Sequence, residues 1–356
     1  MQALSIYAGP KALATIQAHG VSPELFTAVL GASGGPKWFV LYGLDKVLFS
    51  EFMDNSSKNV DIIGSSIGAF RSVCFAQNDS AAAIDRLADS YSNTVYSVKP
   101  TVKEITDKGT VLLKHMLGDA GIADILGQPK KRVHIVVAKS HGLTAKEAKL
   151  KQGSGLLVAA ARNALGRKRL QKSFTRVVFS SSDQGFSFEE KIPIITQQVQ
   201  LNEENFVMSL QATGSIPLVI QGVPDIPGAG EGIYRDGGII DYHFDIKIHT
   251  PGLVLYPHFY KTPIPGWFDK GLKRRSCHRD SYDNVLMLVP NEEFVASLPY
   301  AKIPDRKDFE TMSAEQRIPY WHAVMEQSKR LGDEFLQWVN SDNPIAHVKP
   351  IVLKRN

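Results

Sequence analysis

Residues Asn59 to Phe75 read Asn-Val-Asp-Ile-Ile-Gly-Ser-Ser-Ile-Gly-Ala-Phe-Arg-Ser-Val-Cys-Phe. The β-branched run at 60–63 predicts a short strand, and the small residues at 64–68 predict a tight turn. Residues 69–76 continue as a helix. The stretch therefore predicts a strand, a sharp turn and a helix, with a serine at the apex of the turn.

The turn carries the pattern Gly64-x-Ser66-x-Gly68. Small residues two positions before and after a serine let the backbone bend sharply enough to push the serine hydroxyl out of the turn. The pattern predicts Ser66 as a nucleophile and Ser65 as a small spacer. Such a pentapeptide also arises by chance, so the serine needs a base and an oxyanion site elsewhere in the chain.

The same order of elements occurs upstream, where a strand at 26–30 precedes a glycine-rich loop at 31–37 and a helix at 38–52. Two such units in succession predict an α/β fold with a central, mostly parallel sheet flanked by helices. Residues 192–201 fit a strand or a helix. Further predicted strands are 133–138, 175–180, 253–257 and 285–289, and further predicted helices are 10–19, 202–219 and 313–338.

The composition is that of a soluble globular protein, with 43% apolar and 22% charged residues in 356. We expect a single domain over residues 1–356, because no linker composition divides the chain. The start lacks the pattern of a secretory signal, and no apolar run is long enough to span a bilayer, which predicts a cytoplasmic protein. Cys74 and Cys277 lack metal-site or disulfide spacing, so neither a disulfide framework nor a structural zinc is expected.

The loop Ser33-Gly34-Gly35-Pro36-Lys37 is a candidate oxyanion site. Glycines let backbone N–H groups converge at the start of a helix, where the helix dipole also favours negative charge. A phosphate cradle and a plain tight turn are the alternatives, although neither nucleotide-binding fingerprint fits the spacing.

Asp236, in the sequence Asp236-Gly237-Gly238, is the leading candidate for the base. A carboxylate beside two glycines lies where the backbone can approach closely, which suits a direct contact with a serine hydroxyl. The same tripeptide is also a common turn sequence.

Together, these motifs resemble the patatin-like phospholipase family, whose members use a Ser-Asp dyad. The Ala212-Thr213-Gly214-Ser215-Ile216-Pro217 stretch resembles the small-residue segment that precedes the family's aspartate motif, and Gly34, Gly35 and Lys37 match its glycine-rich loop. The resemblance covers about residues 26–241 and leaves an elaboration at about 242–356. Ser33 and Trp38 depart from the family pattern, and a bulky Trp38 is expected to narrow or reshape the acyl site.

The resemblance implies hydrolysis of fatty-acyl esters of lipids without metal or cofactor. Asp236 would accept the proton of Ser66, Ser66 would form an acyl-enzyme, and the N–H groups of Gly34, Gly35 and Ile67 would hold the oxyanion. One alternative is an α/β-hydrolase with a Ser-Asp-His triad, and another is a catalytically silent lipid-binding protein on the same scaffold. The histidines that follow Asp236 in triad order are His243, His249, His258, His278 and His322.

The segment 266–275 combines two aromatic residues with a cluster of cations. This composition is typical of an interfacial anchor on an anionic membrane and allows a peripheral position there, and a solvated loop with inward-facing rings is the alternative. No motif indicates nucleic-acid binding. The residues of the candidate anchor are Trp267, Phe268, Lys270, Lys273, Arg274 and Arg275.

Overall fold

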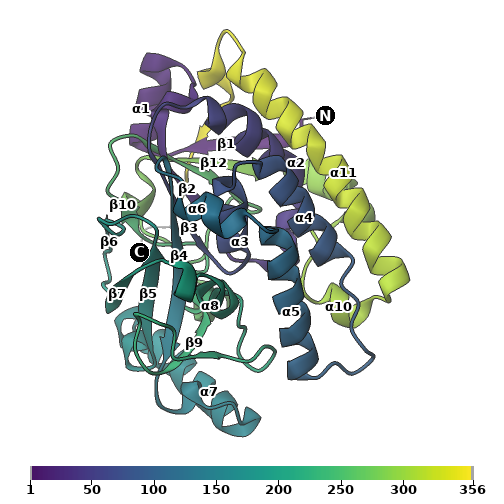
Figure 1. Cartoon of the computed structure of the whole chain (residues 1–356). Coiled ribbons are helices and arrows are strands. Elements are labelled where there is room, and N and C mark those ends of the chain that lie inside the picture. The colour runs from purple at the N-terminus through teal and green to yellow at the C-terminus, as the bar shows by residue number, and fades with distance from the viewer. Residues whose placement is uncertain (1, 354–356) are drawn as a thin grey trace.

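Five parallel strands, in the order β12-β11-β2-β3-β4, form the centre of a large mixed sheet in the computed structural model, which describes residues 2–353 (Figure 1). Strands β1 and β13 extend one side, β5 and β7 extend the other, and β6 and β10 form a separate ribbon. The strands are β1 (Leu4–Ala8), β2 (Phe26–Gly31), β3 (Val60–Ser65), β4 (Lys131–Ser140), β5 (Phe174–Ser180), β6 (Phe188–Glu189), β7 (Thr196–Gln200), β8 (Val223–Pro224), β9 (Ile233–Asp236), β10 (Lys247–Ile248), β11 (Leu253–Pro257), β12 (Val285–Pro290) and β13 (Val348–Pro350).

Helices pack against this sheet, and α2, α3, α4 and α11 lie together on one side of it (Figure 1). The predicted α/β fold with a mostly parallel sheet is confirmed. Within residues 2–353, no helix combines the length and apolar character needed to cross a membrane. The helices are α1 (Pro10–His19), α2 (Tyr42–Val47), α3 (Ile67–Ala76), α4 (Ser80–Ser92), α5 (Val102–Leu117), α6 (Gly121–Leu126), α7 (Lys149–Leu165), α8 (Glu203–Thr213), α9 (Glu292–Ser297), α10 (Asp308–Thr311) and α11 (Ala314–Val339).

Two predicted helices are shorter or more irregular than their patterns indicate. The helix predicted at 38–52 is a 3₁₀ turn at Gly35–Leu41, the short α2, and a π turn at Leu48–Phe52. The helix predicted at 202–219 ends at Thr213, because the next four residues are Gly-Ser-Ile-Pro, and a proline opposes continuation of a helix.

The segment after residue 242 is integrated into the fold. Strands β11 and β12 lie inside the sheet, and α11 packs closely along α2. At this helix crossing a Cβ on Gly43 would come within 2.4 Å of the Lys329 Cα, so the two backbones are almost in contact. The central sheet is therefore completed by residues from the C-terminal third of the chain.

A buried ion pair fixes the helix that follows the elbow serine. Arg71, on α3, donates from Nε and Nη2 to the two carboxylate oxygens of Asp45, on α2, at 2.6 Å each. Both side chains are buried. Removing one partner would leave the other charge buried without compensation.

We therefore expect Asp45→Ala to lower the free energy of unfolding by about 3–5 kcal/mol. Asp107→Ala is the matched control, because it removes the exposed Lys103–Asp107 pair on α5. The control should change stability by less than about 0.5 kcal/mol. Urea denaturation of both variants measures the difference, and equal midpoints would show that the buried pair does not stabilise the fold.

Candidate active site

Ser66 lies between β3 and α3 in a strained backbone conformation. Its φ and ψ angles are 54° and −131°, a combination that residues with side chains rarely adopt. The turn is tighter than the sequence predicts, because Gly64 and Ser65 still belong to β3 and Ile67 already begins α3. The strand-to-helix setting predicted for the serine is present.

Glycines flank the serine because backbones pack against each other at this turn. A Cβ on Gly68 would lie 1.9 Å from the Gly31 carbonyl oxygen, and a Cβ on Gly64 would lie 2.4 Å from the Ala69 nitrogen. The first turn of α3 can therefore rest directly on the end of β2.

Asp236 reaches the serine through the register of the sheet. Along the edge of β4 that faces β3, Ser65 lies opposite Val136 and Asp236 lies opposite the next residue, Val137. The pairing of β9 with β4 therefore covers the residues of β4 directly after those that pair with β3. Gly237 is required at this junction, because a Cβ there would come within 2.0 Å of the Val136 carbonyl oxygen.

The side chains of Ser66 and Asp236 are in direct contact. The Ser66 hydroxyl donates to Asp236 Oδ2 at 2.8 Å, and the Gly238 N–H donates to Asp236 Oδ1 at 2.7 Å. Burial raises the pKa of Asp236 to about 6, although both hydrogen bonds oppose the rise. A carboxylate with a pKa near neutral can accept a proton more readily than an ordinary aspartate.

The small-residue segment at the end of α8 binds the backbone of both residues. The Ser66 N–H donates to Thr213 Oγ1 at 2.8 Å, and the Thr213 hydroxyl donates to the Val136 carbonyl at 2.5 Å. The Asp236 N–H donates to the Ser215 carbonyl at 3.1 Å. Sequence reasoning marked this segment but assigned no role to Thr213, whose hydroxyl group links the Ser66 N–H to the Val136 carbonyl.

Ser33 connects the glycine-rich loop to the elbow. Its Oγ lies 2.7 Å from Ser65 Oγ, and the Ser65 hydroxyl donates to the Asp241 carbonyl at 2.6 Å. A Cβ on Gly238 would lie 2.5 Å from Ser33 Oγ, so the loop and the aspartate turn pack together tightly. The serine found in place of the family's first glycine thus has a structural partner.

The glycine-rich loop faces Ser66, and its departures from the family pattern leave the site open. Gly34 and Gly35 line a cavity together with Ser66, and a Cβ on Gly34 would lie 2.5 Å from the Phe259 ring. Trp38 is completely buried beside Phe39. The expectation that Trp38 narrows the acyl site is wrong, because the indole faces the core and lines neither cavity beside Ser66.

Ile67, the third predicted oxyanion residue, is the first residue of α3. Its N–H therefore belongs to the first turn, where N–H groups lack partners within the helix. The Ser66 N–H, in contrast, is already bound to Thr213.

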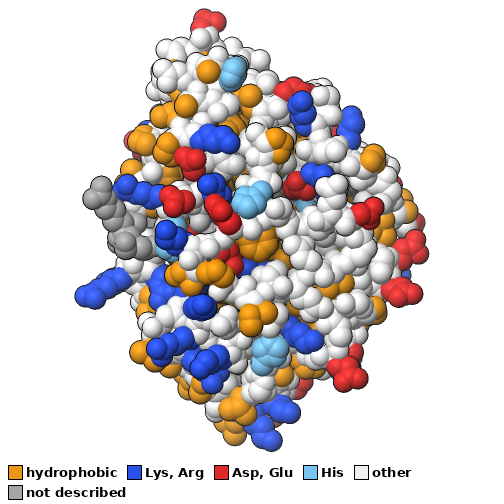
Figure 2. Space-filling view, turned by 90° about the vertical axis from the view of Figure 1, so that its left-hand side faces the viewer, with side chains coloured by type: hydrophobic (Ala, Val, Ile, Leu, Met, Phe, Trp, Pro, Cys, Tyr) orange, Lys and Arg blue, Asp and Glu red, His pale blue; other side chains and the backbone are white. Residues whose placement is uncertain are grey.

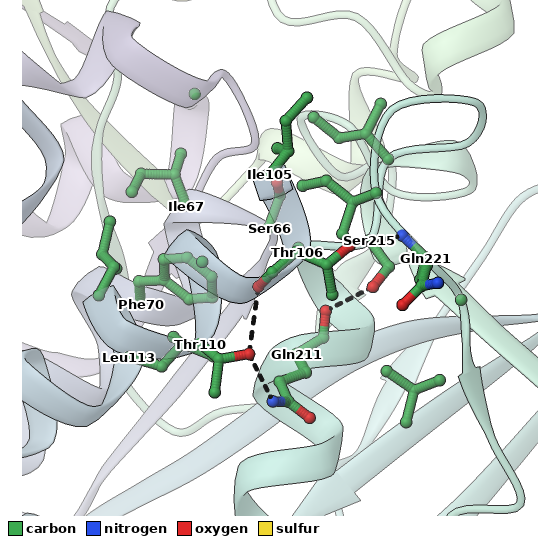
Figure 3. A pocket seen from close by; sticks show the side chains of 18 of the residues that line it. Ser66, Ile67, Phe70, Ile105, Thr106, Thr110, Leu113, Gln211, Ser215 and Gln221 are labelled. Carbon is green, nitrogen blue, oxygen red and sulfur yellow. Dashed lines mark hydrogen bonds between the residues drawn. The ribbon is translucent and has the colours of Figure 1, made fainter. Parts of the chain in front are cut away.

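A largely apolar cavity of about 360 Å³ opens on one side of Ser66 (Figure 3). Its walls come from α3, α5 and α8 and from the loop at 214–224. Figure 3 shows Phe70 and Leu113 side by side, with Ile67 near them and Ile105 farther along the lining. Lining side chains include Ile67, Phe70, Ile105, Leu113, Met208 and Phe309.

A second cavity, of about 220 Å³, opens beside Ser66 and Asp236, and we call it the cationic basin. Lys37, Lys270, Arg306 and Lys307 line it. Lys37 Nζ lies 3.7 Å from an Asp305 carboxylate oxygen. Within residues 2–353, neither Lys270 nor Arg306 forms an ion pair.

The basic groups of this basin are crowded. Lys270 is exposed at the rim, and its Nζ lies 3.8 Å from the centre of the Tyr242 ring. Desolvation, followed by the nearby charges of Lys37 and Arg306, lowers the pKa of Lys270 to about 8. Desolvation also lowers the pKa of Lys37. Sequence reasoning placed Lys270 in a membrane anchor and did not identify Arg306, which belongs to no recognisable motif.

The histidines of the alternative triad have other partners. His278 contacts Asp245, His322 contacts Ser92, and His249 lies near Ser187 and Glu189. The buried His243 and His258 rings contact each other. Among the contacts of residues 2–353, none joins these five imidazoles to Ser66 or Asp236, and no cluster of three metal-ligating side chains occurs in that part of the chain.

The rings of the candidate anchor segment are turned inward. Trp267 and Phe268 are partly buried and pack against a core cluster that includes Phe174 and Ile240. The exposed residues of the segment are Lys270, Gly271, Lys273 and Arg274. The two rings therefore face inward, as expected for a solvated loop and not for a membrane anchor.

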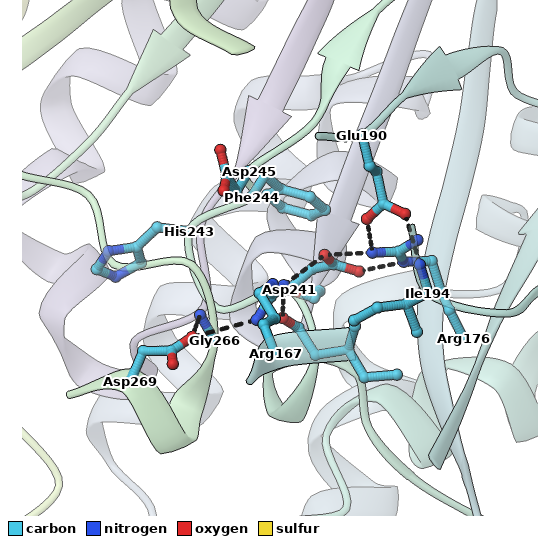
Figure 4. A network of polar contacts seen from close by, with 12 residues as sticks. Arg167, Arg176, Glu190, Ile194, Asp241, His243, Phe244, Asp245, Gly266 and Asp269 are labelled. Atoms are coloured by element: carbon cyan, nitrogen blue, oxygen red, sulfur yellow. Dashed lines mark hydrogen bonds and ion pairs between the residues drawn. The ribbon is translucent and has the colours of Figure 1, made fainter. Parts of the chain in front are cut away.

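A buried network of charges lies behind the site (Figure 4). Asp241 receives hydrogen bonds from Arg176 at 2.6 and 2.9 Å. Asp269 is 3.2 Å from Arg167 and also accepts from Asn163 at 2.6 Å. Asp241 directly follows the turn that begins at Asp236, and Asp269 directly precedes Lys270. The network therefore fixes both of these segments.

Comparisons with known proteins find distant likenesses. No protein-family model matches the sequence, and no curated protein matches it. Human GIVD cytosolic phospholipase A2 is similar in structure with a TM-score of 0.39 and 11% identity, covering 95% of this chain and 63% of that one. VipD from Legionella pneumophila gives a TM-score of 0.28 and 14% identity, covering 72% of this chain and 53% of its own. This chain thus spans less than two thirds of either structure, and likenesses this distant establish neither a family nor an activity for it.

The role of Thr213 can be tested by removing its hydroxyl. We expect Thr213→Val to reduce kcat for ester hydrolysis by roughly 5- to 150-fold, since losing the partner of the partly buried Ser66 N–H costs about 1–3 kcal/mol. Thr213→Ser keeps the oxygen and should restore most of the rate. If both variants were equally impaired with KM unchanged, the hydrogen bond to Ser66 would not be what positions the serine.

Proposed function

We propose that this chain is a serine acyl hydrolase of the patatin-like type, which cleaves fatty-acyl esters of lipids through a Ser66–Asp236 dyad. The observation that carries the proposal is the 2.8 Å contact between the Ser66 hydroxyl and Asp236, on a strained strand-to-helix turn between an apolar and a cationic cavity. The contact supports a proton transfer that needs no histidine.

The proposed reaction proceeds in two halves. Ser66 Oγ attacks the ester carbonyl while Asp236 accepts the hydroxyl proton. The N–H groups of Gly34, Gly35 and Ile67 bind the oxyanion, and collapse of the tetrahedral intermediate expels the alcohol, which takes the proton from Asp236. Asp236 then deprotonates a water that attacks the acyl-enzyme. When the second tetrahedral intermediate collapses, Asp236 returns this proton to Ser66 Oγ as the fatty acid leaves.

The two cavities support an amphiphilic substrate. The apolar cavity suits the acyl chain, and the cationic basin suits an anionic group on the alcohol side of the ester. A phosphate-bearing lipid ester has both features. The competing silent lipid-binding protein rests on the departures at Ser33 and Trp38. Trp38 is buried and lines neither cavity beside Ser66, so only Ser33 lies at the proposed site.

Replacement of the dyad tests the mechanism. We expect Ser66→Ala and Asp236→Asn each to reduce hydrolysis by about 10⁴-fold or more, because each removes an obligatory proton donor or acceptor. A fluorophosphonate probe should label the wild type at Ser66 and leave Ser66→Ala unlabelled. Single alanine variants of His249, His278 and His322 should retain activity. A folded wild type that is not labelled would favour the silent lipid-binding protein, and loss of labelling in a folded histidine variant would favour a triad.

The pH dependence of kcat/KM distinguishes the role of Asp236 as the base from the role of Lys270 in the cationic basin. Because Asp236 must be ionised to accept a proton, kcat/KM should fall as the pH drops below about 6 for every ester. For a phosphate-bearing ester, kcat/KM should also fall above about pH 8, where Lys270 loses its charge. A neutral ester with the same acyl chain should lack this alkaline decline.

Variants in the basin provide the control. Lys270→Ala and Arg306→Ala should each lower kcat/KM for the phosphate-bearing ester by about tenfold and leave the neutral ester unchanged. Lys273→Ala, on the same segment but outside the cavity, should affect neither substrate. Lys270→Arg should keep affinity and abolish the alkaline decline. A decline that persists in Lys270→Arg would assign the titration to another group.

A further inference from the structure

Helix α7 is apolar on two opposite faces. Its inner face, which includes Leu156 and Ala159, packs against the core cluster beside β4 and β5. On the outer face Leu150, Leu157 and Leu165 are 88%, 75% and 72% exposed. Neighbouring exposed apolar side chains on a second face of a helix are a candidate contact surface.

The exposed leucines lie on one side of the helix, interrupted by Ser154, and we call this side the leucine stripe. Spacings of seven and eight residues bring Leu150, Leu157 and Leu165 to the same side of a helix with 3.6 residues per turn. Val158, which is 44% exposed, and Ala161 lie between them. Neighbouring apolar positions on one solvent-facing side are the pattern of an interfacial helix.

The positive charge of the chain is concentrated in the same segment. Residues 141–173 contain eight Lys and Arg against one Glu, a net charge of +7, whereas the whole chain carries +5. The remaining residues therefore sum to −2. The single acid, Glu147, is already paired with Arg235. Exposed cations at both ends of the stripe are Lys146, Lys149, Lys151, Lys168, Arg169 and Lys172.

The surface view agrees with this distribution. In Figure 2 basic and hydrophobic side chains dominate the lower end of the face shown, which is the end where Figure 1 places α7. Acidic side chains lie mainly higher or along the right-hand edge.

We propose that α7 docks on an anionic membrane surface, with the leucine stripe among the acyl chains and the lysines and arginines at the headgroups. An apolar stripe between clusters of cations matches the layers of such a surface. A second copy of this chain fits less well, because a symmetric contact through α7 would bring two patches of the same charge together. The leucines have no counterpart on a nucleic acid.

The start of α7 is also tied to the apolar cavity beside Ser66. Gln152 accepts a hydrogen bond from the Leu218 N–H at 2.6 Å, and Glu147 accepts from the Gly222 N–H at 3.2 Å. The loop that carries Leu218 and Gly222 forms one wall of that cavity. Docking through α7 would therefore bring a wall of the cavity close to the lipid surface.

Vesicle sedimentation tests the proposal without requiring catalysis. We expect the Ser66→Ala protein to bind phosphatidylcholine vesicles that contain phosphatidylserine and to bind pure phosphatidylcholine vesicles at least tenfold more weakly. Leu157→Glu should reduce binding at least tenfold, and Lys149→Gln and Lys151→Gln about fivefold each. Val111→Glu is the matched control, since Val111 is 68% exposed on α5, and it should bind like the parent.

Hydrolysis of a short soluble ester by the same variants in the wild-type background reports their fold, and it should be unchanged. Equal vesicle binding by Leu157→Glu and Val111→Glu would overturn the proposal, as would absence of binding by the parent protein. A dimer in solution that Leu157→Glu converts to monomers would assign the stripe to a second copy instead. Binding of a protein partner through the leucine stripe, without binding to vesicles, would likewise contradict docking on a membrane.

Discussion

Strands β3 and β9 hydrogen-bond to the same edge of β4, one directly after the other, and the candidate site depends on this junction. Ser65 and Asp236 occupy neighbouring rungs opposite β4, so the residue after β3 and the last residue of β9 must meet. A shift of β9 by one residue would turn the Asp236 side chain to the opposite face of the sheet. The contact between serine and carboxylate is therefore a consequence of strand register rather than of side-chain flexibility.

Buried charges keep that register from relaxing. Asp241 lies five residues beyond Asp236, where Arg176 holds its carboxylate while its carbonyl accepts from Ser65. Asp269 is held by Arg167 next to Lys270. Such groups are costly to bury, and their partners are satisfied only when the elbow, the aspartate turn and the basin segment are all in place. The network thus couples the geometry of the dyad to the position of the basin.

The sequence predicts the parts of this site whose signals are local. Strand, turn and helix at Ser66 each have their own residue pattern, and Asp236 stands in a short motif, so both were identifiable. The positions of Lys270 and Arg306 in the cationic basin could not be predicted. They depend on where the C-terminal third of the chain packs, and no local sequence pattern indicates that. Gly155 has a role that depends on packing in the same way. It lets α7 approach the Thr144 backbone, because a Cβ on Gly155 would come within 2.6 Å of the Thr144 nitrogen.

The shifted pKa values on the two sides of the proposed reaction share one physical origin. Desolvation disfavours charge, so it raises the pKa of Asp236 and lowers that of Lys270 in adjoining parts of the same basin. An anionic group that enters the basin would raise the pKa of both residues. It would restore the charge of Lys270 by offsetting the crowding from Lys37 and Arg306, and it would raise the proton affinity of Asp236 further. A substrate that carries a phosphate would therefore strengthen the base that attacks its own ester, whereas a neutral ester would leave it unchanged.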